Sequence, residues 1–431
     1  MNSDKGTIGM YRELIKAKLK SASEYLRVFF KWGFIAALIG VTGGVIGALF
    51  HTAVHKSDTL FMQYDWLIFL LPVGGLAIVW IYKRANMLSN KGTDSIIDSI
   101  RSHDGVPFVI SPLIFISTVI THLFGGRAGR EGAALQLGGS IGSVIAKACR
   151  IGKHGMHVAI MCGMSAVFSA LFGTPITAAF FALGISSIGH MYYPGIVPCL
   201  ISSLAAYIIV ALFGIAPTSF EVLLIPNITA VTILQTILLA ALCAELSIIF
   251  CTVMHYTARY MRIWFKSPYL RIFIGGLALI ALTYLVGTRA YNGSGMDSII
   301  RAVTYAHIDH GWDFALKIIF TAITIGCGFK GGEIVPTFFI GATFGCFISS
   351  LIGFPPGFGA AVGLVAMFCG VLNCPIASII LSVELFGSGG FILFAIAAGV
   401  SYMLSGYYGL YHSQKIVYSK IDGEKIDKIA K

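Results

Sequence analysis

A short run of charged and small residues interrupts a chain that is otherwise apolar enough to lie in lipid. Residues 126–132 read Gly-Arg-Ala-Gly-Arg-Glu-Gly and bring three charges together. An ionisable side chain at membrane depth is costly unless it has a partner or serves a permeation path. Glu131 is therefore the first candidate for a working residue. The alternative interpretation is a structural ion pair of Glu131 with Arg127 or Arg130.

This run belongs to one of two related halves of the chain. Asp-Ser-Ile-Ile occurs at 94–97 and again at 297–300, an offset of 203 residues (297 minus 94). Three glycines repeat at the same offset: Gly129, Gly138 and Gly142 fall on Gly332, Gly341 and Gly345. A series of matches in constant order indicates a duplication. In transporters, such halves pack about a pseudo-twofold axis and hold the substrate between them near the midplane.

Four loops of the two halves are placed to line such a site, around Ser95, Glu131, Glu333 and Tyr411. Glycine-rich breaks that begin helices expose backbone N–H groups and the positive end of the helix dipole. These features favour a negatively charged ligand, so the sequence indicates an anion pathway.

The elements that must position these loops are membrane helices. The chain is 57% hydrophobic and only 11% charged, with a mean hydropathy of +0.84 and 50 glycines. This composition predicts an all-α polytopic membrane protein with ten or more helices, many of them tilted or broken. The clearest expected spans are 34–50, 66–81, 108–123, 157–184, 196–213, 233–255, 272–286, 314–327, 360–381 and 391–405.

The expected organisation has four parts. Residues 1–31 form a basic amphipathic cytoplasmic segment, 32–225 the first membrane repeat, 226–414 the second, and 415–431 a polar cytoplasmic tail. The net charge of +11 then reflects orientation in the membrane and contact with anionic lipid, and no nucleic-acid role is expected. The nine cysteines lie mostly in apolar runs and are expected to pack. His51 and His55 lack a third ligand of suitable spacing, so no metal or other cofactor is expected.

Three motifs resemble those of one transporter family. Residues 129–136 (Gly-Arg-Glu-Gly-Ala-Ala-Leu-Gln) look like the Gly-Arg-Glu-Gly-Pro signature of the CLC chloride channels and chloride/proton antiporters. Residues 330–336 (Lys-Gly-Gly-Glu-Ile-Val-Pro) resemble the second signature of that family, and 409–413 the segment with its pore tyrosine. The similarity extends from about residue 32 to 414 with the motifs in the expected order.

The resemblance implies a homodimer with one pore in each subunit, and a fold of two inverted-topology repeats of tilted and broken helices. Glu131 would be the external gating glutamate, which alternates between occupying an anion site and taking up a proton. Tyr411 would donate a phenolic hydrogen bond to the central anion, and Ser95 would lie where the family places its central serine.

Backbone groups would complete the anion site. Ile334 and Val335 would offer N–H groups from the helix that begins near them, with Gly132 as a further backbone position. A dehydrated halide needs several neutral or weakly positive donors, whereas a full positive charge would trap it.

Departures from the chloride pattern point to a subtype. Ala133 replaces a proline, Ile334 replaces a phenylalanine, and Glu333 adds a carboxyl, as in the fluoride/proton antiporter branch. Fluoride is the anion of a weak acid, and a protonated carboxyl can donate to it. Ser95 and Val335 are unlike that branch, and Ser95 is the chloride-like choice. The sequence favours a proton-coupled antiporter that exports fluoride, or exchanges chloride, in a prokaryotic plasma membrane with both termini cytoplasmic.

Other interpretations stay open at this point. A passive chloride channel has the same motifs, and residues 180–185 contain no internal acid that would identify proton coupling. Glu333, as a second carboxyl, favours antiport. An intramembrane enzyme lacks a recognisable nucleophile or metal set.

Each remaining residue of the predicted site also has a simpler structural interpretation. Glu333 pairs with Lys330, Ser95 caps a helix, and Tyr411 is an interfacial aromatic. Glu384, in an apolar helix, is expected to accept hydrogen bonds from a neighbouring backbone instead of taking part in transport.

Overall fold

The computed structural model describes residues 3–430, and most of them are helical. The first half contains eight α-helices and two short 3-10 helices within that range. They are α1 (Ser3–Gln63), η1 (Asp65–Leu70), α2 (Leu71–Arg84), α3 (Thr93–Ser102), α4 (Ile110–Leu123), α5 (Glu131–Ala148), α6 (Lys153–Phe172), α7 (Pro175–Gly184), η2 (Tyr193–Gly195) and α8 (Ile196–Leu212).

The second half has the same number of α-helices among the described residues. They are α9 (Ala230–Trp264), α10 (Pro268–Val286), α11 (Met296–Thr304), α12 (Asp313–Cys327), α13 (Ile334–Leu351), α14 (Pro356–Leu372), α15 (Pro375–Phe386) and α16 (Phe391–Leu404). The expected boundary at 225/226 falls in the connection between α8 and α9. Seven of the described helices are long and apolar enough to cross a membrane, so the chain is a multi-pass membrane protein.

The helices repeat with the offset of the sequence motifs. Both ends of α13 follow the corresponding ends of α5 by that same offset, and the beginning of α12 follows the beginning of α4 in the same way. The predicted helical membrane fold is confirmed. The ten expected spans did not include α5 or α13, although each begins directly at a motif loop.

Two of the expected spans are each a pair of helices. The segment 157–184 contains most of α6 and all of α7, and the segment 360–381 contains parts of α14 and α15. In each half a residue with positive φ, Gly173 (71°) or Asn373 (57°), ends the first helix. A proline two residues later begins the next helix, where its missing N–H costs nothing.

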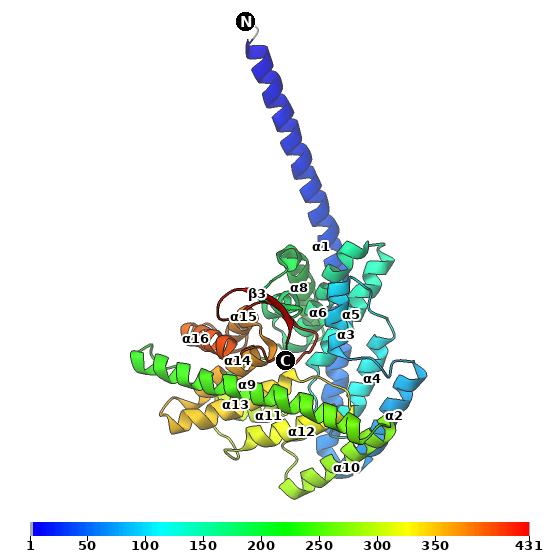
Figure 1. Cartoon of the computed structure of the whole chain (residues 1–431), viewed down its shortest axis with the longest axis vertical. Helices are drawn as coiled ribbons and strands as arrows, with labels where there is room; N and C mark the ends of the chain where they lie inside the picture. The colour runs from blue at the N-terminus through cyan, green and yellow to red at the C-terminus, as the bar shows by residue number, and fades with distance from the viewer. Residues whose placement is uncertain (1–2, 431) are drawn as a thin grey trace.

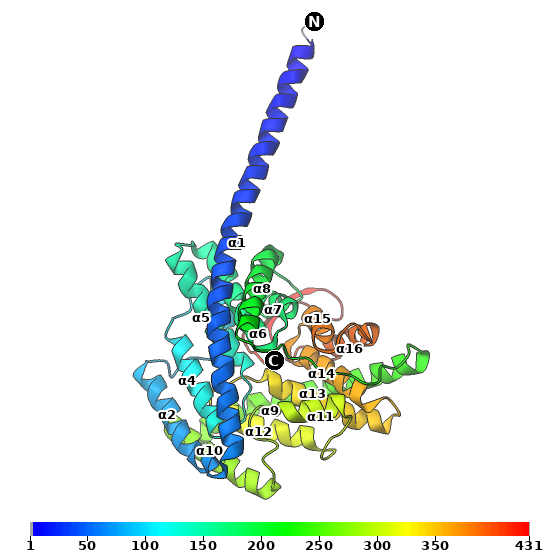
Figure 2. The same ribbon diagram turned by 180° about the vertical axis from the view of Figure 1, so that it is seen from behind.

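The first helix is longer than expected. No proline occurs between residues 3 and 63, and α1 continues through the expected boundary at residue 31 without a break. Figures 1 and 2 show the N-terminal part of α1 projecting from the helical body. The segment 1–31 therefore shares a helix with the first span, at least from Ser3 onwards.

The centre of each half is a tight crossing of two helices. A Cβ on Gly138 of α5 would collide with the carbonyl of Gly163 of α6. In the second half, Gly341 of α13 meets Gly363 of α14 in the same way. Glycine is required at these points because the backbones themselves are in contact. The crossings hold α5 and α13 at fixed positions in the interior.

The C-terminal segment, residues 415–430, is ordered and pairs with a strand of the first half. Strand β2 (Lys415–Tyr418) pairs parallel to β1 (Ser187–Ile188) and antiparallel to β3 (Lys425–Ile429). Lys420 donates hydrogen bonds to Tyr402 O at 2.8 Å and to Ser405 Oγ at 3.1 Å. The expected polar tail is thus a small sheet added to a helical protein.

Candidate anion site

The two motif loops meet at a short antiparallel bridge. Gly129 N donates to Gly332 O, and Gly332 N donates to Gly129 O, both at 2.5 Å. A Cβ on Gly331 would collide with Ala128, and one on Gly332 would collide with Gly132 N. The glycines therefore allow two backbones to approach where side chains would separate them. Because Gly129 and Gly332 are related by the repeat offset, the bridge joins equivalent points of the two repeats.

The Glu131 carboxylate lies at the beginning of the opposite helix. Glu131 is the first residue of α5 and is fully buried. Its Oε2 accepts a hydrogen bond from Val335 N, in the first turn of α13, at 3.3 Å. An exposed N–H at a helix N-terminus is a natural anion ligand. The carboxylate therefore occupies a place in which a free anion would be bound.

The structure also tests the ion-pair interpretation of Glu131. Arg130 Nε lies 3.6 Å from Glu131 Oε1, which is an ion pair without a hydrogen bond. Arg127 instead directs its guanidinium to Ala290 O at 3.4 and 3.5 Å. Arg130 is a weak partner, and the backbone of α13 makes the one hydrogen bond described for the end of this side chain.

The second carboxyl, Glu333, immediately precedes α13. Its Oε2 is buried and has no hydrogen-bond partner among the described residues. Lys330 Nζ lies over the Tyr82 ring, 4.7 Å from its centroid, and no described ion pair joins it to Glu333. Glu333 therefore keeps an oxygen free to accept or, when protonated, to donate a hydrogen bond.

Tyr411 is buried at the same place as Glu333. Only 3% of Tyr411 is exposed, and its hydroxyl has no hydrogen-bond partner in the part of the chain described. Three acidic residues, Glu333, Asp94 and Glu131, lie near enough to act on it electrostatically. The loop of Tyr411 is fixed to α3, because Ser413 N donates to Asp94 Oδ1 at 2.7 Å.

A threonine that the sequence analysis missed completes this group. Thr93 is the first residue of α3, is 6% exposed, and its hydroxyl faces that of Tyr411. Its Oγ1 also donates to Gly132 O at 3.3 Å. The Ser95 hydroxyl instead accepts a hydrogen bond from Lys91 N at 3.1 Å, on the exposed side of the helix start. The feature of the sequence that could have indicated Thr93 is Gly92. Its φ of 68° ends the loop and makes Thr93 the first helical residue.

The other predicted backbone positions divide into two kinds. Ile334 and Val335 are buried at the N-terminus of α13, as expected for N–H donors. Gly132 presents its carbonyl, which accepts from Thr93 and, at 3.2 Å, from Gln136 Nε2. A Cβ on Gly132 would lie 3.1 Å from Glu333 Oε2, so a glycine leaves space beside this acid. The structure thus brings together Glu131, Glu333, Tyr411, the α13 N-terminus and Gly132, but not the hydroxyl of Ser95.

A cavity of about 810 Å³ reaches this site from one side. It is lined by Val335 and Arg130 and by residues of α1, α11 and the loop between α10 and α11. The rings of His51 and His55 stack on its wall with centroids 6.2 Å apart. Among the described residues, no group of three or more His, Cys, Asp or Glu side chains has the arrangement of a metal site.

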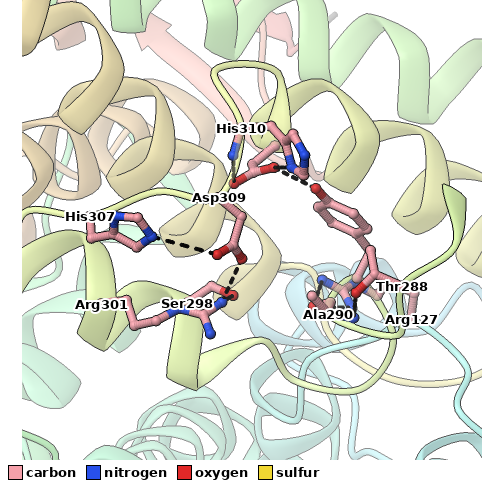
Figure 3. A network of polar contacts seen from close by, with 10 residues as sticks. Arg127, Thr288, Ala290, Ser298, Arg301, His307, Asp309 and His310 are labelled. Carbon is pink, nitrogen blue, oxygen red and sulfur yellow. Dashed lines mark hydrogen bonds and ion pairs between the residues drawn. The ribbon is translucent and has the colours of Figure 1, made fainter.

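Polar contacts hold the wall of this cavity in place (Figure 3). Arg301 donates to Asp309 at 2.7 Å, and Arg127 reaches Ala290 from the other side. Burial, together with the hydrogen bond to Asp313, raises the pKa of Tyr291 in the loop between α10 and α11. Tyr291 therefore stays protonated and fixes that loop to α12.

Glu384 has the structural role expected from the sequence. Its two oxygens accept from Ile176 N at 2.9 Å and Thr177 N at 2.8 Å, at the beginning of α7. This carboxylate therefore caps a helix with both oxygens occupied.

Comparison with known proteins agrees with this geometry. The family model described as voltage gated chloride channel matches residues 74–406. A chloride/fluoride channel protein of Pseudomonas syringae pv. tomato is 32% identical over 95% of this chain and 92% of its own. An H(+)/Cl(-) exchange transporter of Vibrio cholerae is 24% identical over 82% of this chain and 81% of its own.

Solved structures show the same arrangement. The crystal structure of a CLC-type fluoride/proton antiporter matches with a TM-score of 0.86 and 29% identity, covering 89% of this chain and 98% of that one. A slow cyanobacterial Cl-/H+ antiporter matches with a TM-score of 0.74 and 18% identity over 87% of this chain and 94% of that one, which shows the shared fold. With its inverted repeats, its paired motif loops and these relatives, the chain belongs to the CLC family of voltage-gated chloride channels and anion/proton antiporters.

Proposed function

We propose that the protein is a proton-coupled antiporter that exports fluoride, with Glu131 as its gate. The observation that carries this proposal is the hydrogen bond from Val335 N to Glu131 Oε2, in a fully buried position at a helix N-terminus. A carboxylate there excludes a free anion from the same N–H group. Removing its charge by protonation weakens that interaction and frees the site.

The proposed cycle alternates two occupants of the α13 N-terminus. Ionised Glu131 closes the pathway by taking the place of an anion. We assign the cavity lined by Val335 and Arg130 to the outer side of the membrane and call it the outer cavity. When Glu131 receives a proton from this cavity, it leaves Val335 N, and an anion from the inside replaces it. The return of Glu131 as a carboxylate expels the anion outward and releases the proton inward. Each turn therefore moves a proton and an anion in opposite directions.

The inner group of side chains supports fluoride as the transported ion. The buried hydroxyls of Tyr411 and Thr93 are donors, and Glu333 keeps an unpartnered oxygen beside them. A small, hard anion is held best by several short hydrogen bonds from neutral donors. Protonated Glu333 supplies such a donor beside these hydroxyls. A larger halide would gain less binding energy than fluoride from this hydrogen bond. The relatives named for fluoride support the same assignment.

Glu333 is also the proposed internal partner for protons. Residues 180–185 contain no acid, whereas Glu333 lies beside both Glu131 and Tyr411. A proton released by Glu131 has this carboxyl as an acceptor on the inner side. We therefore place proton exchange, like anion binding, at the junction of the two repeats.

Flux from proteoliposomes tests the proposal. Purified protein is reconstituted with internal fluoride or chloride, and anion efflux and external pH are recorded together. We expect fluoride to leave much faster than chloride and to drive protons inward against their gradient. Chloride efflux equal to that of fluoride would overturn the choice of ion. Anion flux without proton movement would identify a passive channel.

The proposal includes the membrane orientation and the assembly. The C-terminal part of α1 lines the outer cavity, so an α1 that crosses the membrane begins on the cytoplasmic side. The homodimer implied by the family resemblance is supported by exposed apolar side chains on α8 and α15, including Ile208 and Ile376. Cross-linking in native membranes, with cysteines introduced at these two positions, tests the dimer.

A further inference from the structure

The inner anion group consists of Thr93, Glu333 and Tyr411, and Thr93 begins α3. The beginning of α11 is the counterpart of this helix start on the opposite side of the molecule. Gly295 precedes α11 with a φ of 74°, as Gly92 precedes α3 with a φ of 68°. These two glycines are related by the repeat offset, so the two helix starts are equivalent. Gly295 and Met296 line the 810 Å³ outer cavity, which Val335 also lines. The beginning of α11 therefore lies on the wall of the same cavity as Val335, the residue whose N–H binds Glu131.

Two fully buried cations lie against this helix start. Arg127 and Lys317 are both 0% exposed. An atom placed as Cβ on Gly295 would lie 2.9 Å from Lys317 Nζ and 3.3 Å from an Arg127 terminal nitrogen. Phe339 lies against both cations, with its ring centroid 4.6 Å from Lys317 Nζ and 5.5 Å from Arg127 Cζ. Both positive charges are thus concentrated at Gly295.

The acids near these charges act only from beyond ion-pair distance: Asp58 on both cations, and Glu131 on Lys317. Lys317 donates to Ser294 O at 3.2 Å, Arg127 makes two long contacts to Ala290 O, and its Nε has no partner. No ion pair joins either cation to an acid in the described part of the chain. Asp58, the acid that acts on both cations, is held by His122 Nδ1 at 2.8 Å. Burying two unpaired cations so close together is strongly unfavourable without an anion.

We propose that the N-terminus of α11, with Arg127 and Lys317, is a second anion site that holds a halide beside Gly295, where the outer cavity meets the two buried cations. It resembles the inner group in using a helix start preceded by a left-handed glycine, but it replaces hydroxyls with full charges. A charged site binds an anion more strongly and releases it more slowly than neutral donors do. The inference rests on the proposed anion transport and adds a place where an external halide waits beside the Glu131 gate.

Bromide provides a direct test that needs no transport activity. Crystals of the full-length protein grown in bromide should show an anomalous peak beside Gly295 N in the unaltered protein. In Lys317→Met, which keeps the length and the apolar stem, that peak should disappear while any peak near Tyr411 stays. A structure without bromide beside Gly295 at saturating bromide would show that Arg127 and Lys317 are structural cations, and would overturn the inference.

Transport kinetics test the same site in the membrane. In Lys317→Met, the external fluoride concentration for half-maximal uptake should rise roughly tenfold, the effect of losing one charge-assisted hydrogen bond. The maximal rate should change much less, because the gate itself is intact. Arg301→Gln is the matched control: it removes a positive charge from the same cavity, but one already paired with Asp309. An equal shift in both variants would indicate a general charge effect and contradict a specific site.

Discussion

The two motif loops share one scaffold but place their acids differently. Both follow a membrane helix, both begin the next helix, and they pair through Gly129 and Gly332. When the two loops are aligned at the repeat offset, their carboxyl-bearing residues do not coincide and lie one position apart. At the repeat offset, Glu131 corresponds to Ile334, and Glu333 corresponds to Arg130.

This shift of one residue separates two chemical roles. Glu131, inside α5, reaches across the bridge and accepts from Val335 N. Glu333, just before α13, leaves an oxygen buried and unpartnered beside Tyr411. One acid therefore accepts a hydrogen bond from a helix N-terminus, and the other keeps an unpartnered oxygen. The duplication supplied two equivalent loops, and in our proposal the position of the carboxyl in each loop distinguishes the gate, Glu131, from a binding group, Glu333.

The largest expected effect comes from removing the gate. Glu131→Gln cannot take up and release a proton, so proton flux should fall at least about 100-fold, the usual contribution of a general acid or base. Anion flux either persists uncoupled or stops. Light-scattering and pH recordings on proteoliposomes measure the two fluxes. The control is Glu384→Gln, which alters a helix-capping acid elsewhere and should keep the coupling. Unchanged proton flux in Glu131→Gln would exclude this residue from the mechanism.

The second change moves the gate without altering its chemistry. In Gly129→Ala, the new Cβ would collide with Glu131 Oε2 and would lie 3.1 Å from Gly332 O. Overpacking of this kind costs about 1–3 kcal/mol, so the carboxylate should leave Val335 N more often and anion leak should increase. Efflux at high pH, where the gate is ionised, measures the leak. Gly399→Ala, with nothing within 4 Å of its Cβ, is the control. Equal leak in the two variants would contradict a gate held by contact.

The third change tests the acid of the second loop. Glu333→Gln keeps the shape but loses the protonated O–H donor, so fluoride preference over chloride should fall roughly tenfold, as for one hydrogen bond to an ion. The ratio of the initial efflux rates of the two halides gives this number. A preference that stays at the value of the unaltered protein would assign selectivity to other groups.

The fourth change compares two neighbouring hydroxyls at the start of α3. Thr93→Val is nearly isosteric and should weaken fluoride binding about two- to tenfold, because a neutral hydrogen bond contributes about 0.5–1.5 kcal/mol. Ser95→Ala removes a hydroxyl that contacts Lys91 N, and should change binding much less. Isothermal titration of the detergent-solubilised protein with fluoride measures both. A larger effect for Ser95→Ala would restore the prediction made from the sequence.

The smallest change lies outside both loops. Burial lowers the pKa of Lys420 to about 8, below its ordinary value of 10.5. The unfolded chain therefore binds more protons between these values, and the free energy of unfolding should rise with pH from about 8 to 10.5. Thermal unfolding across this window should show that rise in the unaltered protein and less of it in Lys420→Met. An identical pH dependence in the two would show that Lys420 is not the group that titrates.

Much of the architecture was predictable from the sequence because it follows from composition and repetition. Apolar runs predicted membrane helices, and the repeat offset predicted that Gly129 and Gly332 are equivalent, which their bridge confirms. The buried position of Glu131 followed from the cost of a charge in lipid. These inferences depend on local sequence and on one long-range symmetry.

The remaining details depend on contacts that sequence patterns do not contain. The Thr93 hydroxyl faces Tyr411, whereas the Ser95 hydroxyl accepts from Lys91 N, because Gly92 has a positive φ and α3 begins at Thr93. The tail forms strands because residues 187–188, in the other half of the chain, offer an edge for pairing. Arg127, in the loop between α4 and α5, and Lys317, in α12, meet only after these distant segments have packed.

The two sides of the bridge between Gly129 and Gly332 are synthesised at different times. Its two sides leave the ribosome one full repeat apart, which at about 5–20 residues per second is a delay of roughly 10–40 s. Throughout that interval, the first loop waits in the bilayer without its partner. Tyr411 emerges later still, because it follows α16, the last of the described helices. The ion pathway is therefore completed only after those helices have been synthesised. A partly synthesised chain has no complete pathway through which ions could leak from the cell.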